Sequence, residues 1–260
     1  MRVEKNTCRL LELFDLHHVR ATFFILGWVA ERCPDLVSTI LRAGHEIGCH
    51  GYSHQMIGRG DEKEFRADIH RAKTILEDLV GAKVKSYRAP SYSITEHTLW
   101  ALEALHDAGF EYDSSIFPVV HDHYGIPDAP RFPHLKSVRG THAIIEFPPS
   151  TVRAYGVNFP VAGGGYFRLF PYPLTAWAIR RINENESQPA MFYLHPWEID
   201  PEQPRISASF RSRFRHYQNL QSTEMKLSRL LDEFSWAPMS EVLALSLTEM
   251  NVKDEVGNGL

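Results

Sequence analysis

The chain has 260 residues, 43% of them hydrophobic and 23% charged, which is ordinary for a globular protein of one large or two small domains. A formal net charge of −4 gives no support to a nucleic-acid binder, and no apolar run approaches the ~20 residues needed to span a bilayer. The three cysteines form no Cys-x-x-Cys pair and the first residues lack a signal-peptide core, so we expect a cytoplasmic protein.

The first half of the chain predicts a regular alternation of helices and buried strands. Apolar residues at helical spacing indicate the helices, and runs of β-branched and aromatic residues indicate the strands. In chain order we expect a helix over 5–18, a strand over 19–26, a helix over 34–43, a short strand before His50, a helix over 61–81, a strand over 84–89, a helix over 95–109 and a strand over 110–116. This alternation implies a parallel sheet with covering helices, either a barrel or an open doubly wound sheet.

The second half of the chain is less regular. Residues 118–142 are rich in proline and histidine without periodicity, and they predict a long ordered loop. Three consecutive glycines over 163–165 predict a tight turn. The remaining expected elements are strands over 144–147 and 190–194, a helix over 173–185 between them, and a late helix over 223–234.

Polar residues follow four of the expected strands. His50 and His54 follow one strand, Arg88 ends the next, Asp113 lies in the strand after that, and His195 ends the last. In parallel α/β folds the carboxyl ends of the strands form the working face. Each residue alone also has a structural interpretation, as a packing charge, a turn residue or a core histidine. Four such coincidences at the same end of successive strands favour a common site.

The segment from His50 to His54 suggests a metal site. Gly51 directly after His50 argues against a helix, so both imidazoles are expected in one loop after a short buried strand. Two neutral imidazoles can bind a borderline divalent ion such as zinc. The alternative is a pair of hydrogen-bonded surface histidines in a chain that contains 14 of them.

These motifs resemble, in order, those of the NodB-homology polysaccharide deacetylases, carbohydrate esterase family four. The segments that carry the resemblance are the strand over 19–27, His50-Gly51-Tyr52-Ser53-His54, Tyr87-Arg88-Ala89-Pro90, Tyr112-Asp113-Ser114-Ser115 and Leu194-His195-Pro196. The later stretches 160–168, 195–201 and 214–217 resemble the branch associated with exosortase and exopolysaccharide gene clusters. They extend the likeness to about residue 245.

The resemblance implies an α/β fold, a distorted (β/α) barrel over 1–200, followed by a C-terminal extension over 201–250 and a frayed tail over 251–260. It implies metal-dependent hydrolysis of N-acetyl groups on amino-sugar residues of a polysaccharide or its oligosaccharide precursor, in exopolysaccharide biosynthesis. The N-acetylated saccharide is then the expected partner.

The resemblance also implies a role for each site residue. His50 and His54 would bind a divalent metal, zinc with cobalt or nickel as alternatives. His195 would be the general acid that protonates the leaving amine, Asp113 would hold and tune His195, and Arg88 would orient the catalytic base. We expect His195 and Asp113 to lie near the two histidines.

Four further residues are expected to contact the substrate. The backbone N–H that follows Pro90, which belongs to Ser91, would help to hold the oxyanion. Tyr166 and Trp197 are candidate stacking surfaces for a sugar ring, with core packing as the alternative role of each.

One departure from the family pattern is serious. The family's first strand ends in an acidic motif that supplies the catalytic base and the third metal ligand, and this motif lies upstream of the helix over 5–18. Asp15 is no substitute, because it lies inside that helix, four residues before the next strand. We therefore expect a barrel without its first strand. Two classes stay open: a deacetylase, inactive as given or shortened by a wrong start assignment, and a non-catalytic carbohydrate-binding relative.

Overall fold

The structure is a computed structural model, and it describes residues 1–122, 124–140, 142–205, 207 and 209–245. The chain divides into two compact units. We call Arg20–Pro148 with Ala237–Leu260 the sheet unit, and Met1–Val19 with Pro149–Trp236 the helical unit. The boundary expected at residue 200 falls inside the helical unit, and the tail expected over 251–260 lies outside the described residues.

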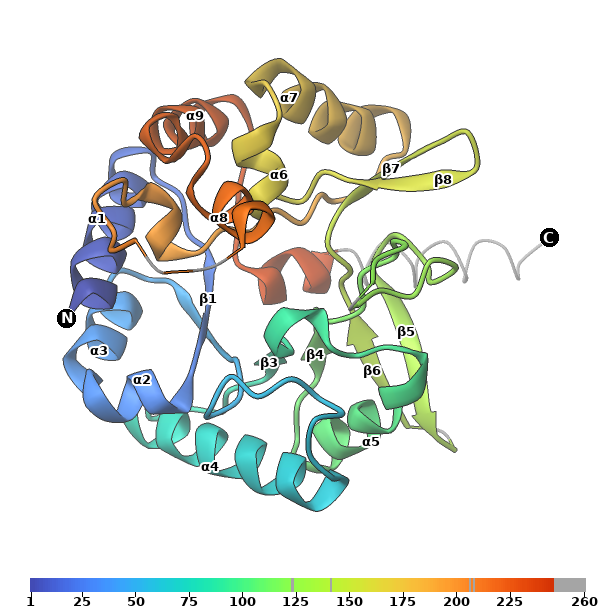
Figure 1. Cartoon of the computed structure of the whole chain (residues 1–260). Helices are drawn as coiled ribbons and strands as arrows, with labels where there is room; N and C mark the ends of the chain where they lie inside the picture. The colour runs from blue at the N-terminus through green and yellow to red at the C-terminus, as the bar shows by residue number, and fades with distance from the viewer. Residues whose placement is uncertain (123, 141, 206, 208, 246–260) are drawn as a thin grey trace. The chain divides into compact units, whose positions relative to one another are not determined.

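The sheet unit is built on six strands, which Figure 1 shows. Their spatial order is β1-β2-β3-β4-β6-β5, and each neighbouring pair is parallel except β5 and β6. The strands are β1 (Thr22–Ile25), β2 (Glu46–Cys49), β3 (Ser86–Tyr87), β4 (Tyr112–Asp113), β5 (His134–Arg139) and β6 (His142–Glu146). The predicted α/β class with a parallel sheet is therefore confirmed.

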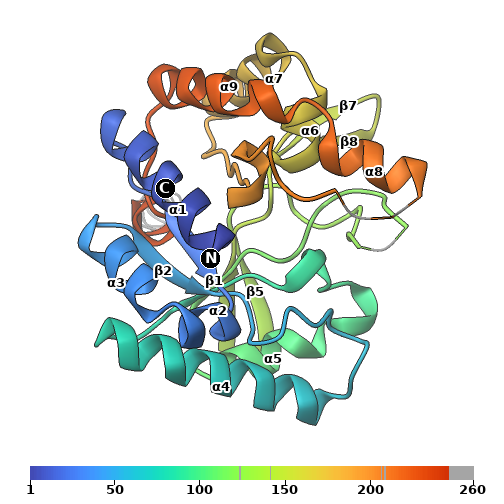
Figure 2. The ribbon, with the colours of Figure 1, turned by 60° about the vertical axis from the view of Figure 1, so that its left-hand side comes forward.

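Helices connect the parallel strands of this unit. They are α2 (Gly27–Arg32), α3 (Pro34–Arg42), α4 (Glu62–Val80) and α5 (Trp100–Asp107), with 3₁₀ turns η1 (Pro90–Tyr92) and η2 (Glu96–Thr98). The long α4 packs against α2, α3 and α5 (Figure 2). It begins at a capping box, in which Asp61 accepts from the N–H of Glu64 at 2.8 Å, and it ends at Gly81 in the left-handed conformation.

Residue Gly27 begins a helix that the sequence analysis did not expect. A Cβ at this position would lie 2.9 Å from Cα of Ala72 on α4 and 2.8 Å from the ring of Tyr52. The glycine therefore permits close packing of α2 on α4, a contact that the sequence does not reveal.

The helical unit contains helices and one hairpin. Its elements are α1 (Arg2–Leu16), β7 (Thr151–Ala154), β8 (Val157–Pro160), α6 (Gly164–Leu169), α7 (Tyr172–Arg180), the π-helical turn η3 (Arg181–Asn185), the 3₁₀ turn η4 (Pro196–Ile199), α8 (Phe210–Tyr217) and α9 (Leu220–Glu233). The turn η4, which follows His195, packs against both α1 and α9. No helix among the described residues is long and apolar enough to cross a membrane.

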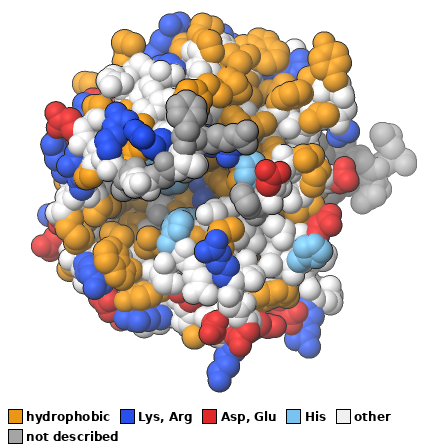
Figure 3. Space-filling model, viewed as in Figure 1, with side chains coloured by type: hydrophobic (Ala, Val, Ile, Leu, Met, Phe, Trp, Pro, Cys, Tyr) orange, Lys and Arg blue, Asp and Glu red, His pale blue; other side chains and the backbone are white. Residues whose placement is uncertain are grey.

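Exposed apolar side chains gather on part of the helical unit. Tyr155 at the hairpin tip is fully exposed, and Val157, Phe159 and Trp177 are each about half exposed. Figure 3 shows hydrophobic side chains gathered at the upper right, where Figure 1 places the β7–β8 hairpin and α7. These side chains contribute little burial free energy to the unit.

Three expectations for the second half of the chain are wrong. Residues 190–194 form no strand, and Tyr193 makes only a single bridge, to Gly163. That contact explains the glycines: a Cβ at Gly163 would lie 1.9 Å from the carbonyl oxygen of Tyr193. The glycine run therefore leads into α6 and is more than a tight turn. The loop expected over 118–142 contains β5, which lies at the edge of the sheet; none of its residues is fully buried, so its sequence has no apolar run that would indicate a strand.

Candidate active site

The loop after β2 brings His50 and His54 together. Their ring centroids are 5.2 Å apart, and the ring planes are inclined at 76°. Gly51 (φ +74°) and His54 (φ +58°) both adopt left-handed backbone conformations, which turn the chain back on itself within four residues. His50 is half-buried and His54 is exposed. The two predicted metal-binding residues therefore face each other in one loop.

The tautomer of His50 is set by a backbone contact. Its Nδ1 lies 2.7 Å from the carbonyl oxygen of Arg88. Because a carbonyl oxygen can only accept, Nδ1 carries the hydrogen and Nε2 is the ring's acceptor nitrogen. Metal-binding histidines commonly donate the other N–H to a backbone carbonyl in this way. The donor set therefore fits a zinc-type ion, although no cluster of three potential ligands occurs within the described residues.

Asp68 on α4 holds the segment between the two histidines. Its carboxylate accepts from the N–H of Tyr52 at 2.7 Å, and from the N–H and hydroxyl of Ser53 at 3.2 and 2.8 Å. A Cβ at Gly51 would lie 2.9 Å from this carboxylate, so the glycine permits the contact. Asp68 was not predicted from the sequence, because a polar residue on an amphipathic helix gives no sign of its partner 16 residues away.

Arg88 is buried and directly follows β3. It donates from Nε to the carbonyl oxygen of Ser114 at 3.1 Å and from Nη2 to the hydroxyl of Ser114 at 2.7 Å. Its guanidinium also lies over the ring of Phe24, 4.5 Å from the centroid. The next turn places Pro90 in the core and exposes Ser91, whose φ of +55° is a strained backbone conformation of the kind found at functional sites.

Asp113 forms a buried acid pair with Glu146, which the sequence analysis did not single out. Both carboxyls are fully buried, and Asp113 accepts from the hydroxyl of Ser115. Glu146 accepts from the N–H groups of Ser115 and Ile116 at 3.1 and 3.0 Å. Burial raises the pKa of Asp113 to about 6, and burial with the charge of Asp113 raises the pKa of Glu146 well above its ordinary value. One proton is therefore shared between the two acids near neutral pH.

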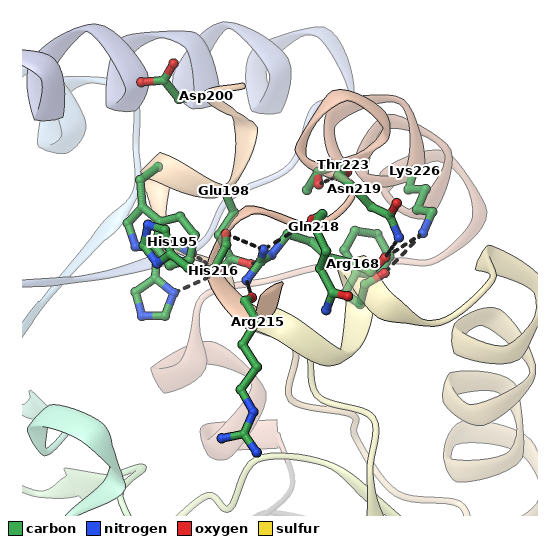
Figure 4. A network of polar contacts seen from close by, with 12 residues as sticks. Arg168, His195, Glu198, Asp200, Arg215, His216, Gln218, Asn219, Thr223 and Lys226 are labelled. Atoms are coloured by element: carbon green, nitrogen blue, oxygen red, sulfur yellow. Dashed lines mark hydrogen bonds and ion pairs between the residues drawn. The ribbon is translucent and has the colours of Figure 1, made fainter. Parts of the chain in front are cut away.

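His195 contacts a different carboxylate, that of Glu198. Its Nδ1 lies 2.8 Å from Oε1 of Glu198, and its backbone N–H donates to the same oxygen at 2.9 Å. The imidazole is half exposed, whereas Glu198 is only 1% exposed. Figure 4 shows Arg168 on the other side of Glu198, where Nε of Arg168 donates to Oε2 at 2.8 Å.

The two candidate stacking residues differ in their surroundings. The ring of Trp197 stacks on His195 at 5.5 Å and on His216 at 4.2 Å between centroids, and Arg168 lies 5.0 Å from its centroid. Tyr166 is partly exposed and has a tilted ring contact with Phe170. Trp197 therefore supports its neighbours, and its role in sugar stacking stays a prediction, as does that of Tyr166.

The predicted site residues thus fall into two groups. The sheet unit holds His50, His54, Arg88, Pro90, Ser91 and Asp113, and the helical unit holds Tyr166, His195 and Trp197. Hydrogen bonds to strand ends or neighbouring turns anchor four of them: His50, Arg88, Asp113 and His195. The expected contact in which Asp113 holds and tunes the imidazole of His195 stays a prediction.

Comparison with known proteins gives the family. The polysaccharide deacetylase family matches residues 2–112, and a domain of unknown function, DUF3473, matches residues 114–244. A peptidoglycan-N-acetylglucosamine deacetylase of Bacillus cereus is 41% identical over 98 residues, which are 37% of this chain and 36% of that protein. A peptidoglycan deacetylase of Helicobacter pylori is 34% identical over 108 residues, 42% of this chain and 36% of that protein.

A solved structure shares the fold. A polysaccharide deacetylase-like protein from Mycobacterium smegmatis superposes with a TM-score of 0.62 at 22% identity, covering 93% of this chain and 78% of that one. The chain spans only about a third of the length of these two curated relatives. The two family matches together cover the chain from residue 2 to residue 244 almost without a gap. Residues 2–112 of the chain therefore match the polysaccharide deacetylase domain, and residues 114–244 belong to the DUF3473 family.

Proposed function

We propose that this protein is a metal-dependent hydrolase that removes N-acetyl groups from amino-sugar residues of a polysaccharide or its oligosaccharide precursor, in exopolysaccharide biosynthesis. The observation that carries the proposal is the pairing of His50 and His54 in one loop, with Nδ1 of His50 bonded to the carbonyl of Arg88. The named deacetylases among the relatives support the reaction, and the DUF3473 domain supports the exopolysaccharide branch.

Four residues of the chain would take part in this reaction: His50, His54, Ser91 and His195. His50 and His54 would hold a divalent ion, with zinc as our first choice. When bound, such an ion polarises a carbonyl and lowers the pKa of a water ligand from ~15.7 towards ~7. The exposed Ser91 would direct its N–H at the oxyanion. His195 would give a proton from Nε2 to the leaving amine, because Nδ1 is committed to Glu198.

A second candidate function is carbohydrate binding without catalysis. It is favoured by one observation: within the described residues, no carboxylate joins His50 and His54 in a cluster of three potential ligands. A hydrolase of this kind needs a carboxylate that accepts the proton of the attacking water, a contribution of about 10²–10⁴ in rate. The two candidates differ in whether acetate is released.

The test is acetate release from N-acetylglucosamine oligomers with added zinc or cobalt. We predict little release by the 260-residue chain, and release about 10²–10⁴-fold faster by a version extended upstream of Met1 with an acidic strand-end motif. A chelator should abolish the activity and fresh zinc should restore it. Full activity in the 260-residue chain would mean that another carboxylate serves as base. Oligomer binding without acetate release by either version would establish the non-catalytic alternative.

A further inference from the structure

The carboxylate of Glu198 joins His195 to a buried arginine. One oxygen faces Nδ1 and the backbone N–H of His195, and the other accepts from Nε of Arg168 (Figure 4). Glu198 and Arg168 are 1% and 3% exposed, so water competes little for either group. Because Glu198 lies on the turn η4, three residues after His195, their contact is short-range, whereas Arg168 comes from α6.

Arg168 is itself anchored on several sides. Its Nη1 donates to the carbonyl oxygens of His216 at 2.7 Å and Gln218 at 3.3 Å, and its Nη2 donates to that of Arg215 at 2.9 Å. These carbonyls lie at the carboxyl end of α8, where backbone oxygens lack helical partners. The guanidinium is therefore fixed in the plane that presents Nε to Glu198. All of these residues lie within the DUF3473 match.

The charge state of Glu198 decides the tautomer of His195. Burial raises the pKa of Glu198, but the hydrogen bond and charge of His195, the charge of Arg168 and the backbone contact outweigh it and lower that pKa below its ordinary value. The carboxylate is therefore ionised at neutral pH and can only accept hydrogen bonds. Nδ1 of His195 must carry a hydrogen, so Nε2 is the nitrogen that faces away from Glu198.

The residue assigned to this task by the family resemblance has other partners. Asp113 accepts from the hydroxyl of Ser115, and it shares a proton with Glu146. If Asp113 were also to hold Nε2 of His195, neither ring nitrogen would remain for the leaving amine, because Nδ1 is committed to Glu198. A single imidazole therefore cannot serve both carboxylates and the substrate.

We propose that Glu198 is the positioning residue of His195, and that Arg168 and α8 hold Glu198 in place, which gives the DUF3473 domain a role in the reaction. This inference rests on the proposed function, in which His195 is the general acid. Glu198 acts through His195 and does not touch the substrate. It fixes the Nδ1–H form of the neutral ring, so that Nε2 exchanges protons with the amine.

The test is the tautomer of His195, measured by long-range ¹H–¹⁵N spectra of the full chain at a pH where imidazoles are neutral. The His195→Gln variant, whose spectrum lacks the ring signals, gives their assignment. The wild-type ring should be in the Nδ1–H form. In Glu198→Gln, we expect the amide oxygen to stay with the fixed Nε of Arg168, so that the amide NH₂ faces His195 and the backbone N–H of His195 loses its acceptor. Nδ1 must then accept, and the hydrogen should move to Nε2.

Asp200→Asn is the matched control. Asp200 lies two residues beyond Glu198 and is nearly as buried, but its carboxylate accepts from Arg2 at 2.8 Å and Asn6 at 3.0 Å. Figure 4 shows it pointing away from His195. The control should keep the Nδ1–H form. In the version of the chain that releases acetate, Glu198→Gln should lower kcat by about 10²-fold or more with little change in KM, as for other wrong-tautomer variants.

Two results would overturn the inference: a wild-type ring in the Nε2–H form, or an Nδ1–H form that persists in Glu198→Gln. The tautomer in the wild-type spectrum tests the inference even if Glu198→Gln fails to fold. The proposed function fails separately. A chain with the Nδ1–H form that releases no acetate with any metal would refute the reaction and leave the contact between Glu198 and His195 standing. An active chain with the Nε2–H form would refute only the positioning role.

Discussion

Replacing Glu146 by glutamine tests how the buried acid pair of the sheet unit is protonated. The pKa of Glu146 is raised well above its ordinary 4.5 by burial and by Asp113. Above pH ~4.5 the folded state therefore binds more protons than the unfolded state, and the free energy of unfolding falls as pH rises. A carboxyl that stays protonated in the folded chain at pH 7 but ionises near 4.5 when unfolded lowers the free energy of unfolding by about 3 kcal/mol.

Glutamine imitates the protonated acid at every pH. Its amide oxygen can accept from the N–H groups of Ser115 and Ile116, and its NH₂ can donate to Asp113. Glu146→Gln should therefore raise the free energy of unfolding by up to ~3 kcal/mol at pH 7 and change it little near pH 4. Glu146→Ala should be destabilised at both pH values, by about 1–3 kcal/mol for each backbone N–H left without an acceptor.

The assay is urea unfolding at about pH 4.5 and pH 7, with the variants compared at each pH. Glu111→Gln is the control, because Glu111 is half exposed and pairs with Lys85 on the surface. It should change the free energy of unfolding by less than ~0.5 kcal/mol at both pH values. The reasoning is refuted if Glu146→Gln destabilises the protein at pH 7, or if its effect is the same at both pH values.

Three further predictions follow from the site and its supports. Asp68→Asn should weaken zinc binding about 10–100-fold in a calorimetric titration, because the single amide oxygen cannot accept from all of the Tyr52 and Ser53 groups that now donate to the carboxylate. Unchanged affinity would show that Asp68 does not order the loop between His50 and His54. Arg168→Met should lower the free energy of unfolding by about 3–5 kcal/mol in urea, since the buried Glu198 would lose its arginine partner and keep only its contacts with His195, and a loss below ~1 kcal/mol would contradict this. Gly163→Ala should be poorly folded by circular dichroism, because a Cβ would lie 1.9 Å from the carbonyl of Tyr193; a native spectrum would argue against that close approach.

The sequence predicted well where local rules decide the structure. Apolar periodicity indicated the helices and strands from residue 5 to residue 116 apart from α2, and the helix expected from residue 61 agrees with α4 and its capping box. Gly51 after His50 correctly argued for a loop. In each case the deciding interaction lies within a few residues along the chain.

Prediction failed where the deciding contact is distant in the chain. The segment over 190–194 is apolar enough for a strand, but its neighbour is a glycine run some 30 residues earlier, which allows one bridge and no ladder. Glu146 and Asp68 are ordinary polar residues in sequence, and only the fold shows what they bond. Glu198 did have a local signal, because it stands three residues after His195, but that spacing is equally typical of a helix cap.

The central claim is that His50 and His54 bind a divalent metal ion, and zinc titration calorimetry tests it most directly. The wild-type chain should bind one equivalent, and His50→Gln and His54→Gln should each weaken binding by about 10²-fold or more. His70→Gln, which replaces an exposed histidine on α4, should bind as the wild type does. A wild-type chain that binds no zinc, or a loss as large in His70→Gln as in the two loop variants, would contradict the account.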